Sequence, residues 1–218
     1  MLRTPADSDD DRSIAGDIVR SLAAQIVAGG LKPNERLRQD EIATAFKASH
    51  VPVREAFRRL EAQGLIVFEP RRGARVASLD RTDVIEVTEM RAALEPVALR
   101  YAVPNIKTAD LEQARIEMAA CDDTNDIAVW EKANRRFHML LYTPSGHTRL
   151  LSAIADLHQA SARHLFATWD ELDWQDRSSA EHAEIVDAIE RGDIETACAT
   201  LKAHILEAGL ALAATMEA

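Results

Sequence analysis

The chain has 218 residues, of which 47% are hydrophobic and 28% are charged. These fractions are typical of a soluble globular protein, and they exclude long disordered stretches away from the chain ends. Because the length exceeds the roughly 150 residues of a typical domain, we expect two domains.

The first twelve residues are polar and acidic and lack the apolar segment of a signal peptide, so we expect 1–12 to form a disordered tail. No stretch approaches the roughly 20 apolar residues of a membrane-spanning helix. The only two cysteines, Cys121 and Cys198, lie far apart and are interpreted as small core residues in a reduced compartment. We therefore expect a cytoplasmic protein without a membrane partner.

The net charge of −10 is distributed unevenly. Residues 12–79 carry twelve Lys and Arg against seven Asp and Glu, whereas residues 80–218 carry thirteen against twenty-five. A small basic module joined to a larger acidic one is typical of a DNA-binding protein whose second domain stays away from the phosphates.

The N-terminal region, 13–77, begins with the pattern of three helices. Ser13 can cap a first helix whose apolar residues recur every four positions, and Gly29-Gly30 ends it. A short second helix is expected over 39–46. Ser49 is expected to cap a third helix that ends at Gly64, with Pro52 in its first turn, where a missing N–H costs little.

Two segments rich in β-formers, LIVFEP and ARVASL, flank Arg71-Arg72-Gly73. This pattern predicts a hairpin with a basic tip. Three helices followed by a hairpin make a winged helix-turn-helix. The second unit, 83–218, follows a linker at 78–82 and shows six helical patterns separated by short polar turns, so the predicted fold is mainly α. The expected helices are 83–102, 109–121, 126–142, 148–169, 175–191 and 194–214.

The third helix carries the residue types of a DNA recognition helix. Its first turn offers Ser49 and His50, and Arg54 and Arg58 lie on its exposed side. An arginine can bond the base edge of guanine or a phosphate. The alternative is a solvated face of an ordinary surface helix, and the adjacent basic hairpin favours DNA.

The run LKPNERLRQDEIATAFKASHVPVREAFRRLEAQGLIVFEPRRGARV resembles the winged helix-turn-helix of the GntR family, most specifically in PVREAFRRLEAQGLI and RRGARV. The resemblance implies that the second and third helices engage the major groove and that the wing tip reaches the minor groove. His50 stands where an Arg is usual, which removes a bidentate fork. The predicted DNA-binding residues are Arg38, Ser49, His50, Arg54, Arg58, Arg71, Arg72 and Gly73.

Asn134 and His138 are four residues apart, so on a helix they project from one face. His182 and His204 lie on later helices. Three imidazoles and one oxygen ligand would suit Zn or Ni. The alternative is that these are ordinary surface or core histidines.

Residues 83–214 resemble the FCD effector domain of the FadR subfamily, in its six-helix, VanR-like group, through MRAALEPVA, NRRFHMLLY and EHAEIVDAIERGDIETACATLKAH. The resemblance implies a divalent metal held by Asp-x-x-x-His and two later histidines. Here Asn134 stands in place of the Asp, and an amide oxygen is a weaker, neutral donor.

Arg91 and Glu95 are also four apart, and a surface ion pair is one reading of them. The FCD resemblance instead points Arg91 into the ligand pocket, and both residues are predicted to contact the effector. An Arg beside a metal suits a carboxylate, so the expected effector is a small organic or sugar acid. No role is assigned to His147, His158 or His164, and Trp130, Trp169 and Trp174 are expected to pack the core or an interface.

We expect a regulator, with repression the commoner habit of the family, that binds a pseudo-palindromic DNA operator as a homodimer. The alternatives are a metal-dependent hydrolase that uses the three histidines, a sensor of the metal itself, and a constitutive DNA-binding dimer with a vestigial pocket. The hydrolase is disfavoured because no carboxylate is clearly placed as general base and the basic module would be unexplained.

Overall fold

The computed structural model describes residues 13–69, 73–78, 80–168 and 175–216. The chain folds into two compact units, 1–79 and 80–218. The predicted tail at 1–12, the wing tip Arg71-Arg72, Trp169 and Trp174 lie outside the described residues.

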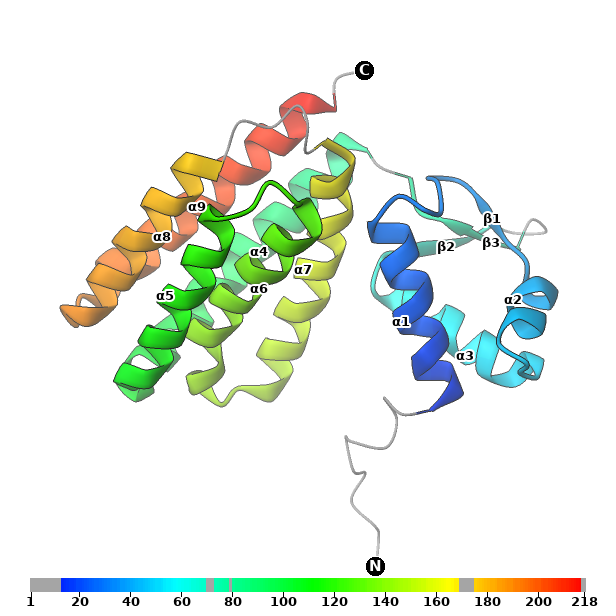
Figure 1. Ribbon diagram of the computed structural model, residues 1–218, viewed down its shortest axis with the longest axis horizontal. Helices are drawn as coiled ribbons and strands as arrows, with labels where there is room; N and C mark the ends of the chain where they lie inside the picture. The colour runs from blue at the N-terminus through cyan, green and yellow to red at the C-terminus, as the bar shows by residue number, and fades with distance from the viewer. Residues whose placement is uncertain (1–12, 70–72, 79, 169–174, 217–218) are drawn as a thin grey trace, which may run out of the picture. The chain divides into compact units, whose positions relative to one another are not determined.

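The first unit contains α1 (Ile14–Val27), β1 (Arg36–Leu37), α2 (Gln39–Ala45), α3 (His50–Ala62), β2 (Ile66–Glu69) and β3 (Gly73–Val76). The strands form an antiparallel sheet in the order β1-β3-β2 beside the helices (Figure 1). The predicted winged helix-turn-helix is confirmed. The short strand β1 was not predicted, because two residues are too few to show an alternating pattern.

The apolar positions of α1 and α3 make the core of this unit. Ile18 and Leu22 of α1 pack with Phe57 and Leu60 of α3, and all four are almost fully buried. Ser13 caps α1 as predicted, since its hydroxyl accepts from the amide of Gly16 at 3.1 Å.

Ser49 occupies the N-cap position of α3, but its side chain makes no capping hydrogen bond. Ser49 therefore stands at the predicted N-cap position, but the expected hydrogen bond from its side chain is not formed. The exposed Ser49 hydroxyl is not used to hold the helix.

The second unit is a helical bundle, and its helices match the six predicted ones within about two residues. They are α4 (Arg81–Ala102), α5 (Thr108–Asp122), α6 (Ile127–Tyr142), α7 (Thr148–Thr168), α8 (Gln175–Glu190) and α9 (Ile194–Thr215). Short 3₁₀ turns, Val103–Asn105 and Thr143–Ser145, follow α4 and α6. The predicted linker 78–82 is partly helical, because Asp80 caps α4 by accepting from the amide of Asp83.

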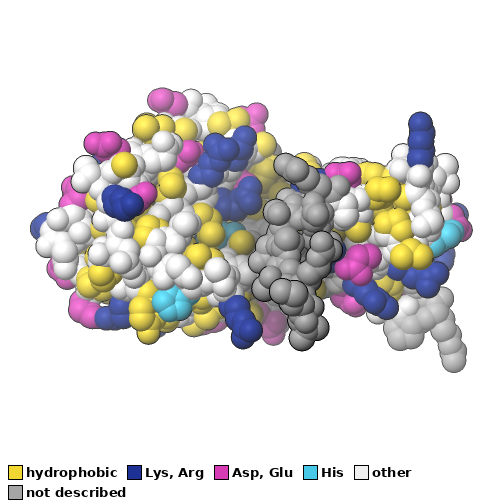
Figure 2. Space-filling view, turned by 90° about the horizontal axis from the view of Figure 1, so that it is seen from below, with side chains coloured by type: hydrophobic (Ala, Val, Ile, Leu, Met, Phe, Trp, Pro, Cys, Tyr) yellow, Lys and Arg dark blue, Asp and Glu magenta, His cyan; other side chains and the backbone are white. Residues whose placement is uncertain are grey.

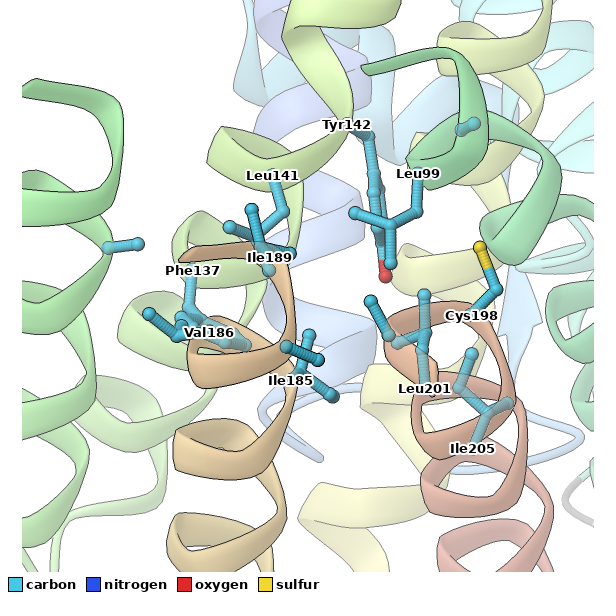
Figure 3. Packing of buried hydrophobic residues seen from close by; sticks show 14 of the residues in the cluster. Leu99, Phe137, Leu141, Tyr142, Ile185, Val186, Ile189, Cys198, Leu201 and Ile205 are labelled. Atoms are coloured by element: carbon cyan, nitrogen blue, oxygen red, sulfur yellow. The ribbon is translucent and has the colours of Figure 1, made fainter. Parts of the chain in front are cut away.

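The core of the bundle lies between α4, α6, α8 and α9. Figure 3 shows Ile185 of α8 on the side of Leu201 of α9, whereas Val186 and Ile189 of α8 lie on the side of Phe137 and Leu141 of α6. Both cysteines are buried and unpaired, as expected.

Two contacts tie α4 to its neighbours. Asp83 of α4 is paired with Arg163 of α7, and its carboxylate lies 3.2 Å from His164 Nε2. Gly209 lets α9 approach α4 closely, because a Cβ at that position would lie 2.2 Å from Thr88 Cγ2. The backbones of α4 and α9 therefore lie near each other along the bundle.

Among the described residues, α9 is the one helix long and apolar enough to cross a membrane, with a mean hydropathy of 1.3. The expectation that no segment is that apolar is wrong for α9. Its apolar character has a local cause: Leu201, Ile205 and Leu212 pack inside the bundle, whereas Lys202 is exposed.

Candidate functional site

Three histidines from three helices meet inside the bundle. His138 of α6, His182 of α8 and His204 of α9 are all buried, and one nitrogen of each lies within 4.8 Å of the others. Burial and the neighbouring His182 keep the pKa of His138 well below its ordinary value, and burial and His204 do the same for His182. The two rings are therefore neutral, which is the form in which imidazole binds metals.

A chain of hydrogen bonds fixes the orientation of His138. The Tyr142 hydroxyl donates to Glu95 Oε2 at 2.6 Å and lies 3.0 Å from His138 Nδ1. Because its proton goes to Glu95, that hydroxyl accepts the Nδ1–H of His138. The Nε2 of His138 is left with its lone pair directed away from Tyr142.

The surroundings of His204 and His182 differ. His204 Nδ1 donates to Glu181 Oε2 at 2.7 Å, so Nε2 is the nitrogen left for a metal. His182 Nε2 is buried and has no hydrogen-bond partner among the described residues. An imidazole held by a carboxylate, as His204 is by Glu181, is a usual second-shell pattern of metal sites, and three clustered imidazoles are a donor set that fits a divalent metal.

Asn134 lies one turn before His138 on α6 and lines the same cavity. Its Oδ1 is buried and accepts no hydrogen bond within the described part of the chain. A buried amide oxygen without a partner costs free energy unless a ligand, an ion or water satisfies it. The predicted set of four residues is thus brought to one place.

The cavity beside the histidines encloses about 60 Å³. Arg91, Ser161 and Ser178 supply polar groups, and Ile205, Leu212 and other apolar residues also line the cavity. A mainly apolar pocket with a few converging polar groups is the usual form of a small-ligand site. This small volume favours a compact ligand.

Arg91 and Glu95 are not the surface ion pair considered from the sequence. Arg91 Nε donates to Glu95 Oε1 at 2.6 Å, and Glu95 is fully buried. Burial alone would raise the pKa of Glu95, but Arg91 and His158 hold that pKa well below its ordinary value. Arg91 lines the cavity, whereas Glu95 lies behind it and positions Arg91 and Tyr142.

No role was predicted for His158, yet this residue belongs to the site. It is buried, lines the cavity, and its Nε2 lies 3.3 Å from Glu95 Oε1. Its position on the same helix face as Ser161 and Leu165 was the available signal. His147 is exposed on a turn, and Trp130 is buried beside the cavity, as expected.

The first unit carries the predicted DNA-binding face. Arg54 and Arg58 are exposed along α3 and form no ion pair with any described residue. Arg38 Nη1 lies 3.4 Å from Glu41, and His50 Nε2 lies 3.5 Å from Asp40. Surface pairs of this kind are weak, so phosphates can displace the carboxylates. Gly73 begins β3 with φ +82°, in the left-handed region.

The helical unit has a mixed surface on the face shown in Figure 2, where acidic and basic side chains are interspersed. No extended basic area covers that face. The contrast with the basic composition of residues 12–79 agrees with a division of labour between a DNA-binding unit and a ligand-binding unit.

The model for bacterial regulatory proteins of the gntR family matches residues 14–76, and the model for the FCD domain matches residues 86–207. The FCD match alone covers more than half of the chain. The chain belongs to the GntR family of transcription regulators and carries an FCD domain. GntR regulators bind DNA operators, FCD domains bind small-molecule effectors, and the family consists of regulators rather than enzymes.

Relatives agree over most of the chain. The "Probable D-xylose utilization operon transcriptional repressor" of Paenarthrobacter nicotinovorans is 31% identical over 195 residues, which cover 88% of this chain and 86% of the relative. The Nta operon transcriptional regulator of Aminobacter aminovorans is 29% identical over 178 residues, covering 80% and 82%. McbR/YncC of E. coli shares the fold, with a TM-score of 0.78 at 23% identity over 93% of this chain and 97% of that one.

The buried carboxylate of Glu95 predicts a pH dependence of stability. Because its folded pKa lies below the ordinary 4.5, its contribution is fully present above pH 4.5 and is lost as the pH falls through the folded pKa. Glu95→Gln should cost about 3–5 kcal/mol at pH 7, since it leaves Arg91 without its charge partner, and should flatten the acid limb. Urea unfolding from pH 3 to 7 measures both effects.

Glu112→Gln is the matched control, because Glu112 is exposed on α5. It should lower the unfolding free energy by less than about 0.5 kcal/mol. An unfolding free energy of Glu95→Gln equal to that of the control would contradict a buried, ionised Glu95.

Proposed function

We propose that this GntR regulator represses transcription and that its FCD domain senses a small organic or sugar acid with the help of a bound divalent metal, Zn or Ni. The observation that carries the proposal is the meeting of three buried histidines beside a cavity that also presents Arg91. Repression is supported by the relative from Paenarthrobacter nicotinovorans, which is named as a probable repressor.

His138, His182 and His204 would hold the metal through Nε2, and Asn134 would add its Oδ1. A bound divalent ion supplies a Lewis acid that attracts an anionic oxygen. The guanidinium of Arg91 is fixed by Glu95 and by Ser161, whose Oγ accepts from Nη1 at 3.3 Å. A guanidinium held in this way can bind a carboxylate of the effector without further ordering.

The neutral Asn134 has two consequences for such a site. It lowers metal affinity relative to a carboxylate, because an amide oxygen is a weaker donor. It also leaves the ion with all of its positive charge when the histidines bind, which strengthens attraction for an anionic effector. We expect bound effector to raise the affinity for the metal and bound metal to raise the affinity for the effector.

In the DNA-binding unit, Arg38, Ser49, His50, Arg54 and Arg58 would contact the operator, together with the wing residues Arg71, Arg72 and Gly73. We propose a cytoplasmic homodimer on a pseudo-palindromic operator, because one winged helix buries too little surface for high specificity. Light scattering that gives only the mass of one chain, with and without DNA, would contradict the dimer.

Effector binding would change operator affinity through a coupling free energy between the units. A coupling of about 1–3 kcal/mol corresponds to a change of about 5- to 150-fold. A sensor of the metal itself is the second candidate, since the same three histidines would serve it. In that case metal alone would change DNA affinity as much as metal with acid.

We predict that the purified wild type binds about one zinc ion per chain and that a carboxylic acid from a panel raises the Tm of the zinc-loaded protein. His182→Ala should lose both responses, because it removes a ligand whose Nε2 has no hydrogen-bond partner among the described residues. Elemental analysis and thermal melts measure these effects, and operator titration with and without the active acid measures the coupling.

His147→Ala is the matched control, because His147 is exposed and lies outside the cavity. It should keep the metal and the acid response. Wild-type protein that binds neither zinc nor nickel and melts at one temperature with every acid would refute the sensor and leave the DNA-binding assignment in place.

A further inference from the structure

The cavity extends along the helices and has two chemically different ends. On α6, Glu131, Asn134 and His138 all line it, and a rise of 1.5 Å per residue separates the first from the last by about 10 Å along the axis. The same direction runs from His158 to Leu165 on α7 and from His204 to Leu212 on α9. The histidines lie at one end and Glu131 at the other.

Glu131 is the one carboxylate among the described residues that line the cavity. Its side chain is only 15% exposed, and its one partner in the described residues is Arg135, whose Nε lies 3.3 Å from Oε1. Burial raises the pKa of Glu131, an effect that Arg135 and Arg91 oppose. Burying a carboxyl group in this position costs folding free energy unless a bound ligand donates a hydrogen bond to it.

Two further oxygen atoms point to the same need. Asn134 Oδ1 and Ser178 Oγ, from two residues that line the cavity, are buried and lack hydrogen-bond partners in the described part of the chain. Asn134 Oδ1 would bind the metal, whereas a Glu131 oxygen accepts hydrogen bonds and the Ser178 hydroxyl can do so as well. A metal at the histidines, together with Arg91, would bind an anion, and the oxygens of Glu131 and Ser178 would accept from a donor.

We propose that the effector carries, besides its carboxylate, a hydroxyl or ammonium group that donates a hydrogen bond to Glu131. The site would then take a small hydroxy- or amino-carboxylate in preference to an unsubstituted acid. A dicarboxylate is rejected, because its second anion would face Glu131. This inference rests on the proposed function, since it places the carboxylate at the histidines and Arg91.

The test uses the full-length, zinc-loaded protein and matched acids of three to five carbons. Each set contains the unsubstituted acid, its hydroxy and amino derivatives, and the dicarboxylic acid of equal length. Isothermal titration should show that a donor-bearing acid binds about 10-fold or more tightly than the unsubstituted one, the effect of a hydrogen bond to a charged group. The hydroxy and amino arms identify which donor the site takes.

Two variants assign the preference to Glu131. Glu131→Gln keeps a hydrogen-bond acceptor but removes the charge. The affinity for an amino-carboxylate should therefore fall about 10-fold, and the affinity for a hydroxy-carboxylate should fall less. Glu131→Ala should remove the preference for either donor. Glu117→Gln is the control, because the Glu117 side chain is 13% exposed, lies 3.9 Å from Arg136, and does not line the cavity.

The outcomes separate this inference from the proposed function. Unsubstituted and donor-bearing acids that bind equally would overturn the role of Glu131 and leave the acid sensor intact. A donor preference that survives in Glu131→Ala would do the same. Protein that holds zinc yet binds none of the acids would overturn the acid sensor, and the inference with it.

Discussion

The buried ion pair of Arg91 and Glu95 is the interaction on which the centre of the helical bundle depends. Glu95 is fully buried and ionised, and it contacts Arg91, His158 and the hydroxyl of Tyr142. Through Tyr142 it fixes the tautomer of His138, and through Arg91 it fixes the cation at the cavity wall. One carboxylate thereby orients both groups that would receive an anionic effector.

This arrangement costs stability. A buried ion pair is often no better for folding than apolar residues of the same volume, and removing one partner is strongly destabilising. The apolar side chains around it, among them Leu99, Phe137 and Ile185, are fully buried and offset part of that cost. A polar cluster kept inside such a core is most simply explained by ligand binding.

The sequence predicted the helices and the winged unit well, because amphipathic periodicity and capping residues are local signals. It also selected the three histidines, since the FCD resemblance assigns them to positions on separate helices. What it missed depends on tertiary contacts. Tyr142 and Glu95 are 47 residues apart, and no local pattern reveals their hydrogen bond.

The same limit explains the errors. The pair of Arg91 and Glu95 has the spacing of an ordinary surface ion pair, and only the packing of neighbouring helices buries it. His158 has no motif of its own, and Glu181 was not identified as the partner of His204. Glu181 lies beside the histidines, but it orients an imidazole and is not placed as a general base, and the family consists of regulators.

The most direct test of the account is the zinc affinity of Tyr142→Phe, measured by competition with a chelating indicator. Removing the hydroxyl deprives His138 Nδ1 of its acceptor, so the affinity should fall about 10- to 100-fold, as for other second-shell partners. Tyr101→Phe, at an exposed position of α4, should bind zinc like wild type. Wild-type zinc affinity in a folded Tyr142→Phe protein would contradict the claim that Glu95 and Tyr142 prepare His138 for a metal.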